Sequence, residues 1–138
     1  MSFWSKKVGE VARKEVVTLS PEKSVRDAAT AMYSSGIGSV VITSPEGVVI
    51  GIFTERDLTR VVSQGVPYDT QLGAVMTRSP VVIKSSEPLS RAVELMAERN
   101  IRHLPVVDEN NRVIGILTAR DVVDLTQKYL ASAAYSSE

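Results

Sequence analysis

Residues 51–58 read GIFTERDL, and residues 115–122 read GILTARDV. Both stretches follow the pattern Gly-Ile-apolar-Thr-x-Arg-Asp-apolar, and 64 positions separate them. A shift of 64 positions aligns residues 17–58 with residues 81–122 without a gap. Because a fixed period is the signature of a structural unit used more than once, the sequence predicts one unit that occurs twice.

The hydrophobic pattern changes in the same order inside each copy. Residues 15–19 (EVVTL) and 80–84 (PVVIK) are short β-branched runs, which predict a strand. A helix with one apolar face should follow, because apolar residues then recur at i, i+3, i+4 and i+7. These residues are Val25, Ala28, Ala29 and Met32 in one copy and Leu89, Ala92, Val93 and Met96 in the other. Two more strands, SVVIT and VVIGIF or HLPVV and RVIGIL, lead into a final helix, so each unit is predicted to be β-α-β-β-α.

Several residues are typical of helix ends. Ser24 and Asp27 can form a capping box, and Pro88 suits the first turn of the equivalent helix in the second copy. The helix that begins at Thr54 should end near Gly65, because Pro67 follows.

The fold class is predicted to be α+β (α/β). A unit of this size buries too little surface to be stable alone, so the two repeats should pack sheet to sheet about a pseudo-twofold axis. The small, polar C-terminal tail is expected to fray. The predicted organisation is repeat 1 at 8–64, a linker at 65–74, repeat 2 at 75–130, and tails at 1–7 and 131–138.

Composition narrows the possible functions. Lys and Arg number 16 and so do Asp and Glu, so a net charge of +0 gives no general attraction to nucleic acid or to an anionic membrane. There is no cysteine and only one histidine, which disfavours thiol chemistry and transition-metal sites, and no metal is expected. No apolar run is long enough for a signal peptide or a membrane span, so we expect a cytoplasmic location.

The repeated Thr-x-x-Asp has two interpretations. It can be a capping box alone, with Thr as N-cap and Asp three residues later. It can also form a nucleotide site, because a helix N-terminus attracts phosphate, Thr and Arg add donors, and a carboxylate accepts hydrogen bonds from ribose hydroxyls. Gly51 and Gly115 would let backbone or a ligand come close.

The tandem units resemble a pair of CBS domains, named for cystathionine β-synthase. The matching stretches are VVTLSPEKSVRDAATAMYSSGIGSVVI…GVVIGIFTERDL and PVVIKSSEPLSRAVELMAERNIRHLPVVDENNRVIGILTARDV, within about residues 8–130. The resemblance implies a module that senses adenosine-containing ligands such as AMP, ADP, ATP or S-adenosylmethionine. It also implies a homodimer.

The resemblance further implies two sites, each closed crosswise by the Thr-x-x-Asp of one repeat over the first strand of the other. Asp would bind ribose, Thr would help hold ribose or phosphate, and adenine would lie against backbone. One site is expected to contain Val17, Ile37, Gly38, Ser39, Thr118, Arg120 and Asp121, and the other Val81, Ile101, Arg102, His103, Thr54, Arg56 and Asp57.

The two sites should differ in strength. Ala119 leaves the phosphate position of the Asp121 site roomy, whereas Glu55 in the other copy competes with phosphate for the same positive potential. Arg102 could offset Glu55 or fill the cleft. We therefore predict that the Asp121 site is the stronger one.

Other conspicuous residues are expected to serve structure. His103, the only histidine, lacks a nucleophile pattern nearby and should pack in a strand or against a ligand. The N-terminus is locally basic through Lys6, Lys7, Arg13 and Lys14, which form a solvated face or, as an alternative, contact a phosphate or RNA. Phe3 and Trp4 should pack on a neighbouring surface or a dimer interface, or belong to a disordered tail.

The predicted function is an adenine-nucleotide-binding (AMP/ADP/ATP) regulatory module without a cofactor or catalytic residues, which reports to an unidentified protein. No phosphate-loop, dinucleotide-binding or Ser/His/Asp pattern indicates an enzyme. The alternatives are a ligand-free dimerisation or interaction scaffold, an S-adenosylmethionine-binding protein, and an RNA-binding protein.

Overall fold

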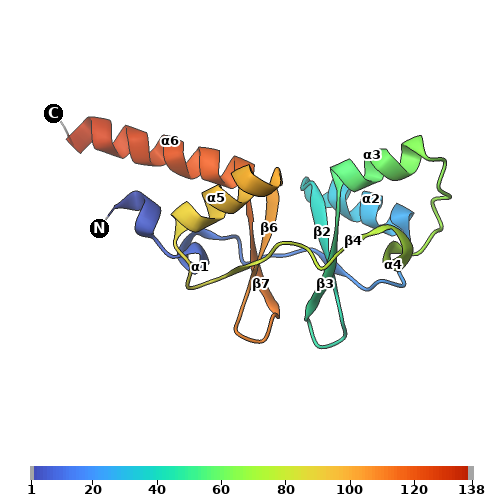
Figure 1. Cartoon of the computed structure of the whole chain (residues 1–138). Coiled ribbons are helices and arrows are strands. Elements are labelled where there is room, and N and C mark those ends of the chain that lie inside the picture. The colour runs from blue at the N-terminus through green and yellow to red at the C-terminus, as the bar shows by residue number, and fades with distance from the viewer. Residues whose placement is uncertain (1, 137–138) are drawn as a thin grey trace.

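The computed structural model describes residues 2–136. Two sheets lie back to back, and helices cover the outer face of each sheet (Figure 1). The elements are η1 (Phe3–Ser5), α1 (Val8–Val11), β1 (Thr18–Leu19), α2 (Val25–Ser35), β2 (Ser39–Thr43), β3 (Val49–Thr54), α3 (Glu55–Ser63), α4 (Leu72–Val75), β4 (Thr77–Arg78), β5 (Ile83–Lys84), α5 (Leu89–Arg99), β6 (His103–Val107), β7 (Val113–Thr118) and α6 (Ala119–Ser136).

Both sheets have the same topology at their centre, which confirms the predicted β-α-β-β-α unit. The order is β1-β2-β3-β4 in one sheet and β5-β6-β7 in the other, with a parallel first pair and an antiparallel second pair. The first strand of each unit is shorter than predicted. Val16 and Val82, which precede these strands, instead pack between the two sheets.

The helix ends follow from local chemistry. Ser24 and Asp27 form the predicted capping box, with reciprocal bonds of 2.9 and 3.1 Å at the start of α2. Pro88 is the N-cap of α5 and not a residue of its first turn, because its ψ of 154° is extended. Helix α3 ends at Ser63, and Gly65 with φ of 70° turns the chain away as predicted.

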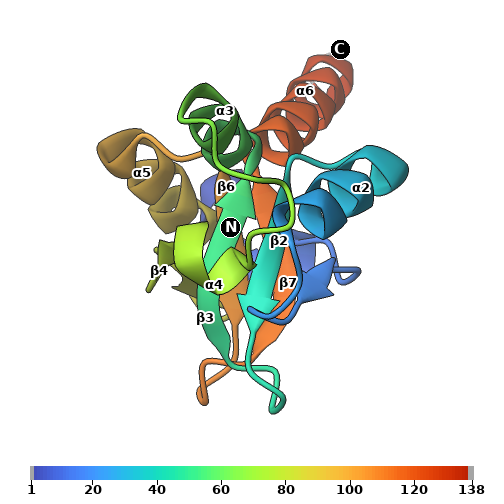
Figure 2. The ribbon, with the colours of Figure 1, turned by 90° about the vertical axis from the view of Figure 1, so that its right-hand side faces the viewer.

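Three apolar clusters hold the layers together. One lies between the first sheet and its helices, around Phe53 and Leu72, and one lies between the second sheet and its helices, around Leu89 and Leu117. The third joins the two sheets and contains Val41, Val49, Val107 and Ile116. The predicted sheet-to-sheet packing is therefore present. Figure 2, which looks onto the face of the first sheet, shows α2, α3, α5 and α6 toward the end opposite the hairpin tips.

The repeats exchange their leading segments. Val8 of α1 is fully buried in the core of the second repeat, and Leu72 of α4 is fully buried in the core of the first. After α1, Arg13 bonds to Ile116 of β7 through both backbone groups, at 3.0 and 2.9 Å. After α4, strand β4 pairs with β3 of the first sheet. The segment predicted as a linker, 65–74, therefore contains most of α4, which packs in the core of the first repeat.

The hairpin tips of the two sheets are also joined. Val49 N–H donates to the carbonyl of Asn111 at 3.0 Å, and Val113 N–H donates to the carbonyl of Gly47 at 3.1 Å. These bonds connect the β2–β3 hairpin to the β6–β7 hairpin at the end of the molecule away from the helices (Figure 1).

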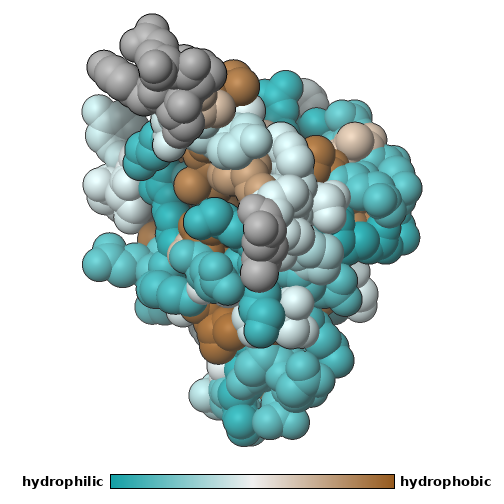
Figure 3. Space-filling model, turned by 90° about the vertical axis from the view of Figure 1, so that its left-hand side faces the viewer, coloured by the Kyte–Doolittle hydropathy of each residue, from teal (hydrophilic) through white to brown (hydrophobic). Residues whose placement is uncertain are grey.

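The two chain ends pack on each other. Phe3 is buried, its ring stacks on Tyr129 of α6 at 4.8 Å, and it meets Trp4 edge to face at 4.7 Å. Apolar residues are visible between hydrophilic ones on this side of the molecule (Figure 3). Helix α6 continues to Ser136 through most of the segment predicted to fray, because residues 131–136 extend an already formed helix. The last two residues of that segment lie outside the described residues.

Candidate functional site

The strand-to-helix turns of β3–α3 and β7–α6 have the same geometry. Asp57 N–H donates to the Thr54 hydroxyl at 3.3 Å, and Thr54 N–H donates to Asp57 Oδ2 at 2.9 Å. The corresponding distances for Thr118 and Asp121 are both 3.0 Å. Each Asp is 8% exposed. The capping interpretation of Thr-x-x-Asp is therefore correct for both copies, and it positions two nearly buried carboxylates.

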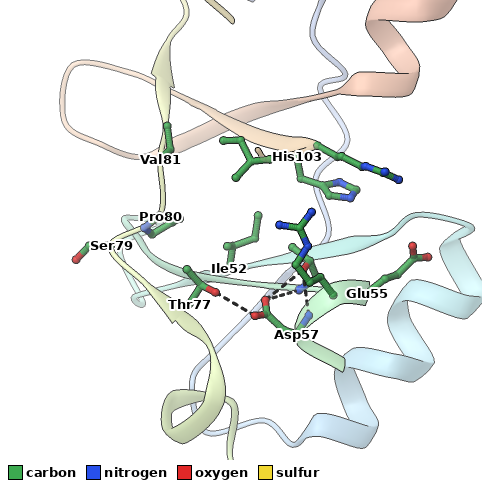
Figure 4. Close-up of a pocket in the computed structure, with 12 residues that line it drawn as sticks. Ile52, Glu55, Asp57, Thr77, Ser79, Pro80, Val81 and His103 are labelled. Atoms are coloured by element: carbon green, nitrogen blue, oxygen red, sulfur yellow. Dashed lines mark hydrogen bonds between the residues drawn. The ribbon is translucent and has the colours of Figure 1, made fainter. Parts of the chain in front are cut away.

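A pocket of about 440 Å³ lies at the start of α3, and we call it the Asp57 pocket. Thr54, Glu55, Arg56 and Asp57 contribute from the first repeat, and Val81 and His103 face them from the second (Figure 4). All seven residues predicted for this site line the pocket. The complete lining is Ile52, Thr54, Glu55, Arg56, Asp57, Thr77, Ser79, Pro80, Val81, Ile101, Arg102 and His103.

A larger pocket of about 1240 Å³ lies at the start of α6, and we call it the Asp121 pocket. Of the seven residues predicted for this site, Val17, Ile37, Gly38, Thr118 and Arg120 line it. Ser39 and Asp121 do not. The remaining lining is Arg13, Lys14, Glu15, Val16, Ser35, Gly36, Glu55, Arg102, His103, Ile116, Ala119 and Val123.

Burial explains the two residues that do not line the Asp121 pocket. Ser39 is 1% exposed, and its hydroxyl has no hydrogen-bond partner among the described residues. Asp121 is 8% exposed, and Arg13 contacts its carboxylate. Arg13 Nε donates to Asp121 Oδ1 at 2.8 Å, and a second guanidinium nitrogen lies 2.7 Å from the same oxygen.

The exchanged segments bring the residue that contacts each carboxylate. Arg13 and Thr77 are equivalent under the 64-residue shift, and each lies beside the strand that leads to the Thr-x-x-Asp turn of the other unit. The Thr77 hydroxyl donates to Asp57 Oδ1 at 3.1 Å, and Arg60 lies farther from that oxygen, at 3.4 Å. A cation therefore holds Asp121, and mainly a neutral hydroxyl holds Asp57.

The two repeated glycines make room for these segments. A Cβ on Gly115 would lie 2.9 Å from the carbonyl oxygen of Arg13, and a Cβ on Gly51 would overlap the Met76 side chain. These glycines were expected to let either backbone or a ligand come close, and the structure shows the close approach of the backbone.

The pockets share one wall. Glu55, Arg102 and His103 line both of them, so Glu55 faces the Asp121 pocket as well as its own. A Cβ on Gly38 would meet both Glu55 and His103 at about 3 Å, which shows how tightly this wall packs. Burial lowers the pKa of His103, and the nearby Glu55 carboxylate opposes that shift. The Nδ1 atom of His103 has no hydrogen-bond partner among the described residues.

Sequence reasoning did not assign the residues of the leading segments to the pockets, although it named Arg13 and Lys14 as part of a solvated basic face or a phosphate or RNA contact. Arg13, Lys14 and Glu15 line one pocket, and Thr77 and Ser79 line the other. The equivalence of the two segments was visible, because the 64-residue shift that aligns Val17 with Val81 also aligns Val8 with Leu72 and Arg13 with Thr77, but their exchange between the repeats was not. The contacts themselves join residues up to 108 positions apart and have no local pattern.

The comparisons with known proteins agree with this architecture. The CBS domain family model matches twice, at residues 8–64 and 72–128. An uncharacterized protein of Methanopyrus kandleri is 42% identical over 127 residues, which is 91% of this chain and 64% of that protein. Inosine-5′-monophosphate dehydrogenase of Methanocaldococcus jannaschii is 34% identical over 86% of this chain, but the match spans only 23% of the enzyme.

Solved structures show the same fold. The CBS domain pair of protein MJ0100, in complex with 5′-methylthioadenosine and S-adenosyl-L-methionine, superposes with a TM-score of 0.84 at 27% identity, over 90% of this chain and 98% of that one. A CBS domain protein from Pyrobaculum aerophilum complexed with AMP superposes with a TM-score of 0.80 at 25% identity, over 88% of this chain and 99% of that one.

No helix within residues 2–136 is long and apolar enough to cross a membrane.

Proposed function

We infer the function from the premise that this chain belongs to the CBS domain family, of which it is a tandem pair. We propose that it binds adenine nucleotides (AMP, ADP or ATP) in the Asp57 and Asp121 pockets as regulatory ligands, and that it catalyses no reaction itself. The observation that carries the proposal is the repeated geometry. Each pocket lies between the repeats. One repeat contributes a capped helix start and a nearly buried carboxylate beside it, and the other repeat contributes the facing backbone.

Each part of a nucleotide has a matching group. The helix start and the adjacent arginine, Arg56 or Arg120, suit a phosphate. Asp57 or Asp121 suits the ribose hydroxyls. Apolar residues from the opposite repeat, Val81 or Val17, offer a surface for adenine. The complexes of similar CBS proteins with AMP and with S-adenosyl-L-methionine support an adenosine-containing ligand.

Calorimetry with variants tests the proposal most directly. Asp57→Asn and Asp121→Asn keep the size of the side chain and an oxygen for the helix cap, but they remove the charge that strengthens bonds from ribose. We expect each to weaken nucleotide binding at its pocket by about 1.5–3 kcal/mol, the usual contribution of a hydrogen bond to a charged group.

Asp27→Asn is the matched control. Asp27 makes the same capping box at the start of α2 but lines neither pocket. It should leave nucleotide affinity unchanged. Equal losses in all three variants would attribute the effect to helix capping and contradict the proposal.

Thermal denaturation separates the proposed function from its alternatives. A ligand at about 100 times its dissociation constant should stabilise the chain by about 2.7 kcal/mol. AMP, ADP, ATP, 5′-methylthioadenosine and S-adenosylmethionine should be compared side by side. A shift with the last two alone would favour the S-adenosylmethionine alternative, and no shift with any of them would favour a ligand-free scaffold.

A regulatory role requires that the ligand bind one arrangement of the protein better than another, because equal binding shifts no equilibrium. We expect a homodimer to provide these arrangements and an unidentified protein to respond to them. The balanced net charge of the chain speaks against RNA as the main partner. The cytoplasmic location stays a prediction.

A further inference from the structure

The carboxylates of the two pockets differ in what a ribose would have to displace. Oδ2 of each Asp accepts a backbone N–H from its own cap, and Oδ1 is the oxygen that accepts from the exchanged segment. At Asp57 the shorter bond comes from the Thr77 hydroxyl, at 3.1 Å, which can rotate toward another acceptor and receive a bond from ribose. Arg60 lies 3.4 Å from the same oxygen and donates more closely to the Val75 carbonyl, at 2.7 Å. At Asp121 two guanidinium nitrogens of Arg13 contact Oδ1.

Releasing Arg13 from Asp121 is costly unless the guanidinium gains another anion. Bonds between two charged partners are roughly twice as strong as bonds between neutral ones. An uncharged nucleoside offers Asp121 two hydroxyls but offers Arg13 nothing in return. A phosphorylated ligand offers hydroxyls to Asp121 and a phosphate to Arg13. A phosphate accepts two parallel hydrogen bonds from a guanidinium, just as a carboxylate does.

Arg13 lies where a phosphate could receive it. It lines the Asp121 pocket together with Thr118, Ala119 and Arg120, which form the N-terminus of α6. Its side chain is 52% exposed, so the guanidinium is not locked in place. Lys14 lines the same pocket, and no basic residue occupies the position equivalent to Arg13 in the Asp57 pocket.

We propose that Arg13 restricts the Asp121 pocket to phosphorylated nucleotides, while Thr77 leaves the Asp57 pocket open to the nucleoside as well. In the empty pocket Arg13 pairs with Asp121. When a nucleotide enters, the guanidinium passes to the phosphate and the ribose takes Asp121 Oδ1. This inference rests on the proposed function and assigns a ligand class to each pocket.

Two-dimensional amide NMR of the full chain, titrated with adenosine and separately with AMP, tests the proposal. Val17 lines only the Asp121 pocket and Val81 only the Asp57 pocket, so their amides report on each pocket separately. At Val17 we expect AMP to bind at least about tenfold more tightly than adenosine, which corresponds to ~1.4 kcal/mol. At Val81 the two affinities should lie closer together.

Exchanging the two residues should exchange the selectivity. Arg13→Thr should tighten adenosine binding at the Asp121 pocket, weaken AMP binding there, and bring the affinity ratio toward one. Thr77→Arg should create a preference for AMP at the Asp57 pocket. Arg13→Gln, a neutral side chain of similar reach, provides a second variant if Arg13→Thr does not give a dispersed spectrum.

Lys14→Thr is the matched control for charge. Lys14 lines the same pocket but bonds to the carbonyl of Gly9 and not to Asp121. It should reduce AMP affinity less than Arg13→Thr does, and it should not tighten adenosine binding, because it does not release Asp121. Equal changes in Lys14→Thr and Arg13→Thr, or an AMP-to-adenosine ratio at Val17 that Arg13→Thr does not alter, would overturn the proposal. If neither ligand shifts either amide at millimolar concentration, the proposed function itself fails.

Discussion

The Asp57 and Asp121 pockets are built from the same parts and differ through residues outside the repeated phrase. Both have a capped helix start and a carboxylate that is 8% exposed. The exchanged segment then brings a hydroxyl to one carboxylate and a guanidinium to the other. A duplicated site therefore keeps its scaffold while a residue far away in the sequence changes the group that contacts its carboxylate.

The pockets also differ in size, in the direction the sequence indicated. The Asp121 pocket is about 1240 Å³ and the Asp57 pocket about 440 Å³. The simple argument from Ala119 and Glu55 is nevertheless incomplete, because Glu55 lines both pockets and Glu15 lines the larger one. That the Asp121 site is the stronger one stays a prediction, which the calorimetry of Asp57→Asn and Asp121→Asn decides.

The largest effect on stability should come from the exchanged helices α1 and α4, each of which packs in the core of the other repeat. Leu72→Ala should lower the free energy of unfolding by about 2–5 kcal/mol, the range for a fully buried leucine. Val8→Ala, at the equivalent position, should cost less because it removes a smaller side chain. Urea denaturation measures both, and Val62→Ala, on an exposed position of α3, should change little.

Both core variants should unfold in one transition, because each core contains a segment from the other repeat. Two separate transitions would show that the repeats unfold independently, which would contradict the exchange of core segments between them.

A smaller effect should distinguish the two glycines. Gly115→Ala brings a Cβ against the backbone carbonyl of Arg13, which cannot move alone, and should cost about 1–3 kcal/mol as an overpacked site. In Gly51→Ala the nearest group is the flexible Met76 side chain, and the backbone carbonyl oxygen of Thr77 lies farther away, at 3.1 Å, so the loss should be smaller. Thermal unfolding of the pair measures the difference, and a larger loss for Gly51→Ala would show that the Arg13 segment adapts more easily.

The smallest effect should come from the shared wall. Burial holds the pKa of His103 below its ordinary value, with Glu55 and Asp121 opposing that shift and Arg102 adding to it. The unfolded chain then binds more protons than the native one at mildly acidic pH, so stability should fall as the pH drops below about 6.5, the ordinary histidine value. Chemical denaturation between pH 8 and pH 5 should show this slope.

His103→Gln is the comparison for the pH series and should flatten the slope in this range. The pKa values of Asp27 and Asp108 are also lowered, by backbone hydrogen bonds above all, but those carboxylates titrate at more acidic pH. An unchanged slope in His103→Gln would assign the pH dependence to other groups.

The sequence predicted the architecture well where the signal was periodic. The 64-residue repeat, the amphipathic helix around Met32 and the Thr-x-x-Asp caps all follow from local patterns that the structure confirms. The seven residues predicted for the Asp57 site all line one pocket, because the turn and the facing strand of each unit are regular elements.

What could not be predicted depends on long-range contact. Helices α1 and α4 have only four residues each, too few for a periodic signal, so their exchange between the repeats was not visible. The pairing of Arg13 with Asp121 spans 108 positions, and nothing near either residue indicates it. The extension of α6 to Ser136 was also missed, since small polar residues resemble a tail when no neighbouring contact is known.

The exchanged segments have a consequence for any chain that carries a single such repeat. Without its partner, one repeat would leave a hydrophobic groove empty where α1 or α4 inserts, and an open strand edge where Arg13 or β4 pairs. It could close both only by receiving the leading segment of a second copy, as a domain-swapped dimer. Joining two repeats in one polypeptide makes that swap intramolecular, so completion of each half no longer depends on protein concentration.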